Sequence, residues 1–193
     1  MALTVTPEQL GLVLPSDKHI VYGVIMDWAM DDAIATTVAF SSGDASLYLS
    51  SGGGTIGGGQ HEKVSAVAKS FVDLAQTMLT KSTKTEATPL PRQDVVNFYL
   101  LTNRGIHVGQ DEMNNFQNNS SNWLNLFIEG NSVLAELTKT EERKIHICSD
   151  VRPRRRLYRG CSGMRVCNAR LSVKIGVCPL SPLAQELAWR SCV

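Results

Sequence analysis

Apolar and polar residues alternate through the first quarter of the chain in a pattern that predicts three β-strands. Val, Ile, Thr and aromatic residues are enriched over residues 19–28 and again over 33–40. Over residues 45–51 the alternation is strict, with apolar residues on one face and serine or tyrosine on the other. Polar turns at 31–32 and 41–44 separate these segments. Short turns join antiparallel neighbours, so we expect a three-stranded meander.

Two later segments repeat apolar residues at helical spacing, and two strands lie between them. The first predicted helix covers residues 61–79, and the second covers 123–138. The strands cover 95–102 and 106–109, joined by a short turn that contains Gly105. The residues expected to face the core from the two helices are Val64, Val67, Ala68, Phe71, Leu74, Ala75, Met78, Phe127, Gly130, Leu134 and Leu137.

The predicted element order is therefore β-β-β-α-β-β-α, and the fold class is α+β. We expect a five-stranded antiparallel sheet with two amphipathic helices on one face, in one compact domain of residues 1–142. Residues 81–93 and 111–122 are polar and are predicted to be loops. Residues 1–18 form a weakly patterned lead-in with a short helical turn after Thr6.

Charge separates the predicted domain from the rest of the chain. Residues 1–142 hold 8 Lys and Arg against 16 Asp and Glu, a net charge of −8, whereas residues 143–193 hold 11 against 2, a net charge of +9. This basic tail loses the amphipathic pattern and is also rich in cysteine. We interpret it foremost as an out-of-frame or read-through extension; a disordered basic arm and a small ordered element remain open.

The tail contains the residue types that bind nucleic acid or metal, without the patterns that those functions require. Its arginine cluster (Arg152, Arg154, Arg155 and Arg156) is an alternative nucleic-acid contact, but no groove-reading helix accompanies it. The five cysteines show no C-x-x-C pair, so we predict no metal site. The cysteines are Cys148, Cys161, Cys167, Cys178 and Cys192.

A glycine-rich stretch at residues 52–59 is the sharpest local motif. Gly52, Gly54 and Gly57 match G-x-G-x-x-G between a strand and a helix, as a dinucleotide-binding loop requires. The preceding strand belongs to an antiparallel meander, however, and no P-loop lysine follows the glycines. We therefore favour glycines that bend the edge of the sheet, with a small-molecule or nucleotide site as the alternative.

Two other groups of polar residues suggest chemistry only weakly. Three carboxylates near the first turn have the charge for a divalent cation but lack the spacing of a calcium loop, so we interpret them as a solvated turn. A serine, a histidine and an aspartate would suggest a triad, but the last two are about 18 Å apart along one predicted helix. The three carboxylates are Asp27, Asp31 and Asp32. The residues of the would-be triad are Ser51, His61 and Asp73. We predict no catalytic residue and no cofactor.

The glycine-rich stretch and the helix after it resemble uncharacterised small bacterial proteins. At the level of topology, residues 19–138 are similar to the profilin-like class, which includes roadblock and longin domains. That resemblance implies a dimeric scaffold or a regulator of nucleotide-binding partners. We therefore expect a non-catalytic interaction module that forms a homodimer. With no secretory signal and no apolar run of membrane-spanning length, we expect it in the cytoplasm.

Overall fold

The computed structural model describes residues 2–30 and 33–150, and it describes side chains as far as residue 140. Contacts divide the chain into two compact units, Met1–Arg143 and Lys144–Val193, and the first unit is described by itself. The arginine cluster, four of the five cysteines, Asp31 and Asp32 lie outside the described residues, and the side chain of Cys148 lies outside the described side chains. The domain boundary predicted at residue 142 stays a prediction.

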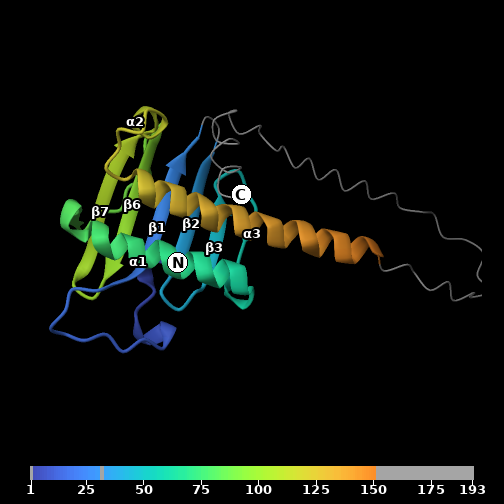
Figure 1. Cartoon of the computed structure of the whole chain (residues 1–193), viewed down its shortest axis with the longest axis horizontal. Coiled ribbons are helices and arrows are strands. Elements are labelled where there is room, and N and C mark those ends of the chain that lie inside the picture. Colours follow the sequence, from blue (N-terminus) through green and yellow to red (C-terminus); the bar gives the residue numbers. More distant parts are fainter. Residues whose placement is uncertain (1, 31–32, 151–193) are drawn as a thin grey trace, which may run out of the picture. The chain divides into compact units, whose positions relative to one another are not determined.

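The first unit is an α+β structure with one antiparallel sheet, as the sequence predicted (Figure 1). The sheet has seven strands in the order β4-β3-β2-β1-β6-β7-β5, so the predicted count of five was wrong. The strands are β1 (Val21–Ala29), β2 (Ile34–Phe40), β3 (Ala45–Leu49), β4 (Gly54–Thr55), β5 (Thr83–Thr85), β6 (Val95–Thr102) and β7 (Gly105–Glu112).

The two strands that the sequence missed are the edges of the sheet. β4 lies within the glycine-rich stretch and pairs with Leu47 and Tyr48 of β3. β5 lies within a predicted loop and pairs with three residues of β7. Strands of two and three residues are too short to show an alternating pattern, so only their long-range pairing defines them. β7 is longer than predicted because β6 holds it in register as far as Glu112.

The described residues also form three α-helices: α1 (Glu62–Met78), α2 (Met113–Gln117) and α3 (Leu124–Asp150). α1 and α3 lie across the same face of the sheet (Figure 1), which the amphipathic patterns predicted. α2 occupies a segment that we expected to be a loop. Short 3₁₀ turns cover Ala2–Thr4, Glu8–Leu10, Gly58–Gln60 and Leu79–Lys81.

The main core lies between this face and the helices, and aromatic rings form one end of it. Trp123 stacks on Phe98 with ring centroids 5.6 Å apart, and Trp28 meets Phe127 edge to face at 5.4 Å. A Cβ atom at Gly109 would lie 2.0 Å from the Trp123 ring, so only glycine allows β7 to pass beneath that ring. These tryptophans and Phe127 therefore belong to the helix–sheet seam.

A second, smaller apolar cluster lies on the opposite face of the sheet. Its buried members are Tyr22, Ile25, Val38, Phe40, Tyr99 and Leu101. Apolar residues between positions 2 and 14 pack against it, and the Tyr22 hydroxyl donates a hydrogen bond to the carbonyl of Val5 at 2.9 Å. The lead-in segment is thus a cover for the sheet. The sequence pattern did not predict this role, because the lead-in segment contains no long helix or strand.

Candidate functional site

One residue from each of five strands forms a continuous polar row across the second sheet face. The strand register pairs Tyr48 with Thr36, Thr36 with Asp27, Asp27 with Asn97, and Asn97 with Gln110. The next row along the same face is mainly apolar, with Ile25 and Tyr99 of the second cluster at its centre and Ser46 at its β3 end. A polar row beside an apolar one in the middle of a sheet is not needed for packing, so it is a candidate site.

Asp27 occupies the centre of this row within β1 and is only 6% exposed, so its interpretation as part of a solvated turn was wrong. The Thr36 hydroxyl donates a hydrogen bond to its Oδ1 at 2.5 Å. No ion pair of Asp27 occurs among residues 2–30 and 33–140, and the five strands that form the row contain no Lys or Arg. Burial raises the pKa of the Asp27 carboxyl above its ordinary value, against the opposing effect of the Thr36 hydrogen bond.

Asn97, opposite Asp27 on β6, is held by the loop that precedes its strand. Its Nδ2 donates to the Tyr99 hydroxyl at 3.2 Å and to the carbonyl of Pro89 at 3.3 Å. The Tyr99 hydroxyl donates to the same carbonyl at 2.5 Å. Asn97 is 4% exposed, and its Oδ1 accepts no hydrogen bond within the described part of the chain. The centre of the row therefore holds more acceptors than donors.

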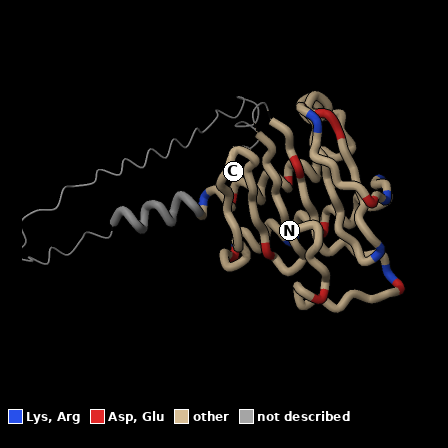
Figure 2. Tube along the Cα trace, turned by 180° about the vertical axis from the view of Figure 1, so that it is seen from behind, with Lys and Arg blue, Asp and Glu red and all other residues tan. Residues whose placement is uncertain are grey.

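The two ends of the row are open. Tyr48 is 41% exposed on β3, and Gln110 is exposed on β7. Basic positions gather on the β6–β7 side of the sheet when the molecule is seen from behind (Figure 2). Asp27 is the one charged residue among the five that form the row.

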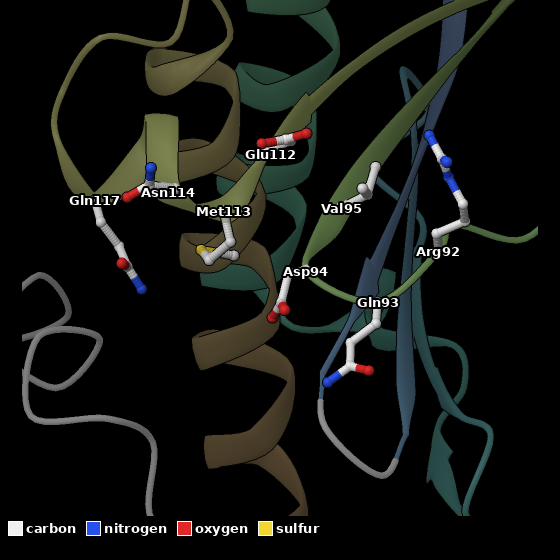
Figure 3. A pocket seen from close by; sticks show the side chains of 8 residues that line it. All are labelled: Arg92, Gln93, Asp94, Val95, Glu112, Met113, Asn114 and Gln117. Atoms are coloured by element: carbon white, nitrogen blue, oxygen red, sulfur yellow. The ribbon is translucent and has the colours of Figure 1, made fainter.

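A pocket of about 630 Å³ lies beside the row, where β6 begins and β7 ends (Figure 3). Val95 and Glu112, which line it, are register partners one row beyond Asn97 and Gln110. Its other lining residues carry both charges and several amides: Arg92, Gln93, Asp94, Met113, Asn114 and Gln117. This size suits a small ligand, although such sites are usually more apolar. Nothing in the sequence pattern indicated the pocket, because its two sides are distant in the chain.

The glycine-rich stretch forms an edge strand and a 3₁₀ turn. Gly52, Gly54 and Gly57 all have positive φ, and a Cβ at Gly54 would lie 2.1 Å from the carbonyl oxygen of Leu47. The backbone conformation therefore explains why glycine occupies these positions, in agreement with the favoured interpretation that the glycines shape the edge of the sheet. Two carboxylates lie nearby: Asp44 lies against Gly59, and Glu62 begins α1. Their charge opposes phosphate binding at this helix start, and the nucleotide site stays a prediction.

The structure keeps the residues of the rejected triad apart and brings two histidines together. His61 precedes α1 and Asp73 lies three turns along it, so the triad is not formed. His19 and His107, 88 positions apart, meet with ring centroids at 5.0 Å. Their rings also contact the hydroxyls of Thr102 and Ser82. Burial lowers the pKa of His107, and the charges of His19 and Lys84 lower it further.

Comparisons with protein-family models, with curated proteins and with solved structures found no match to this chain. Within the described residues, no helix combines the length and apolar content needed to cross a membrane. No group of three or more His, Cys, Asp or Glu side chains in that part of the chain is arranged to hold a metal ion. The polar row is therefore the site on which we base a functional proposal.

Proposed function

We propose that the first unit is a non-catalytic protein-interaction module, and that its partner binds the second sheet face over the polar row. The observation that carries the proposal is Asp27, a buried carboxyl with no cation beside it in the described residues. Burying an unpaired carboxyl costs several kcal/mol, roughly, unless the group is protonated. A chain that keeps such a group in its sheet face gains no stability from it, which supports a role in recognition.

The exposed part of the same face supports this position for the interface. Tyr48 is a large side chain that is 41% exposed at one end of the row. Tyrosine is enriched at interfaces because it combines a large contact area with a hydrogen-bonding hydroxyl. Strands β2 and β3 carry only small or apolar residues around it, so a partner would meet no large charged side chain there.

The edges of the sheet offer a poorer route to association. β4 has two residues and β5 has three, including Lys84, and short strands with lysine protect a sheet from edge pairing. We therefore place the predicted homodimer contact, as well as contact with any other protein, on the face. This arrangement also agrees with the scaffold role implied by the profilin-like resemblance.

Photo-crosslinking tests the proposal directly. We would replace Tyr48 with p-benzoylphenylalanine in the full chain and irradiate cells of its native host. Ser70, exposed on the outer side of α1, is the matched control position. An adduct at Tyr48 that is absent at Ser70 supports the module, and its mass distinguishes a second copy from another protein. Equal adduct yields at both positions, or none at either, would refute it.

The pocket at the start of β6 favours a second candidate function, the binding of a small polar molecule. Arg92 can hold an anionic group, while Asp94 and Glu112 can hold a cationic one. A thermal-shift screen with amino acids, nucleotides and dinucleotides tests both this pocket and the glycine-rich stretch, because a ligand far above its Kd raises the Tm. An Arg92→Gln variant separates the two sites, since Arg92 lines only the pocket.

A further inference from the structure

We propose that the polar row binds a primary ammonium group, which Asp27 and Asn97 hold between them. The inference rests on the proposed function, because it specifies the chemistry that a partner would present on that face. The ammonium belongs either to a lysine side chain of a partner protein or to a small free amine. Both sources share one chemistry, a positive nitrogen with three N–H donors on an alkyl stem.

The hydrogen-bond donors nearest to Asp27 and Asn97 make bonds within the protein. The Thr36 hydroxyl donates to Asp27, the Asn97 Nδ2 donates to the carbonyl of Pro89 and the Tyr99 hydroxyl, and that hydroxyl donates to the same carbonyl. The remaining groups are acceptors: the rest of the Asp27 carboxyl and the buried Oδ1 of Asn97. A ligand for this site must therefore bring donors, and a positive charge matches Asp27.

The strand register places the two acceptors at a suitable separation. Asp27 and Asn97 are directly opposite on antiparallel strands, so their Cβ atoms lie about 4.5–5.5 Å apart. A single nitrogen can reach an oxygen of each side chain at about 2.8 Å. A guanidinium group is wider and carries five donors, more than the remaining acceptors of Asp27 and Asn97 can satisfy. Calcium requires six to eight oxygen ligands, roughly, which Asp27, Thr36 and Asn97 cannot supply.

Tyr48 and Thr36 give the alkyl stem a path to the centre of the row. Tyr48 is the partner of Thr36, and Thr36 is the partner of Asp27. With strands about 4.8 Å apart, Tyr48 is about 10 Å from Asp27, which is farther than an extended lysine side chain reaches, so the stem would lie over Thr36 with Tyr48 beside it. The Tyr48 ring can cover the stem, as aromatic rings do for cationic ligands.

The alternative occupant of the row is a proton. A protonated Asp27 would donate to the Oδ1 of Asn97, and the acceptors would then be satisfied without a ligand. An Asn97 amide turned with its nitrogen toward Asp27 would have the same effect. Either arrangement predicts that amines leave the row unchanged, so a binding measurement separates them from the proposal.

We would titrate the ¹⁵N-labelled full chain at pH 7 with n-butylammonium and, separately, with Nα-acetyl-lysine methylamide, and follow the NMR signals of Thr36, Asp27 and the Asn97 side chain. n-Butanol, a neutral molecule of the same shape, is the ligand control. Asp27→Asn is the test variant, and Asp73→Asn, an exposed aspartate on α1, is its matched control. The spectrum of each variant without ligand shows whether it folds.

The proposal expects saturable shifts with both amines, none with butanol, at least tenfold weaker binding in Asp27→Asn and unchanged binding in Asp73→Asn. Tighter binding of the lysine derivative indicates a partner side chain, and tighter binding of butylammonium indicates a free amine. No shift at tens of millimolar amine, equal shifts with butanol, or full binding by Asp27→Asn would overturn it. Crosslinking at Tyr48 is independent of these results, so failure here and failure of the interaction module can be distinguished.

Discussion

Replacing Asp27 with asparagine should stabilise the protein, which is unusual for a change in the centre of a sheet. The amide keeps an oxygen that can accept the Thr36 hydrogen bond. It also removes the unpaired charge and adds a donor opposite the unsatisfied Oδ1 of Asn97. The substitution is nearly isosteric, so we expect no cavity and no overpacking.

The size of the gain follows from the groups that change. An unsatisfied buried polar group costs about 1–3 kcal/mol, and each unit by which folding raises a carboxyl pKa costs about 1.4 kcal/mol at neutral pH. We therefore expect a gain of about 1–3 kcal/mol at pH 7. For a unit of this size, that corresponds to an increase in Tm of roughly 3–10 °C.

The gain should depend on pH with a defined sign. Because the folded-state pKa of Asp27 is raised, the folded protein binds this proton more tightly than the unfolded chain does. The wild type therefore loses stability as the pH rises from about 4 through the folded-state pKa, while the amide does not titrate. Urea unfolding at pH 3, 5 and 7 measures the difference. A destabilised variant at pH 7, or a gain that is the same at all three values, would refute the reasoning.

Three further changes test the fold and the site. Gly109→Ala should cost about 1–3 kcal/mol in urea unfolding, because the new Cβ meets the Trp123 ring. The same change should cost less in a Trp123→Leu background, where the clash is absent; unchanged stability in the single variant would contradict the close packing. The pKa of His107 is lowered in the folded protein, so the unfolded chain takes up this proton first and the wild type loses stability as the pH falls from 7 to 5. In His107→Gln this loss should be smaller; the same pH slope in both proteins would count against this. Tyr99→Phe should cost about 1–2 kcal/mol and speed hydrogen exchange in the loop around Pro89, because it removes the hydroxyl bonded to that carbonyl; unchanged exchange would mean that this bond does not hold the loop.

Elements whose signal is local could be predicted from the amino-acid pattern alone. Strands β1, β2 and β6 and helix α1 were predicted within about two residues, because their side chains repeat with the period of a strand or a helix over at least seven positions. The turn containing Gly105 was also predictable, since its φ of 111° is in the region that favours glycine. These features require no knowledge of what lies on the neighbouring strand.

The edges of the sheet, the cover on its second face and the polar row depend on contacts between distant parts of the chain, which no local pattern predicts. Alternation along a strand tells which residues share a face, but it does not tell which residue lies opposite on the next strand. Asp27 and Asn97 are 70 positions apart and become neighbours through the register of β1 and β6. The row takes one residue from each of five strands, so no segment contains enough of it to form a motif. Its chemistry arises because pairing places these five side chains side by side.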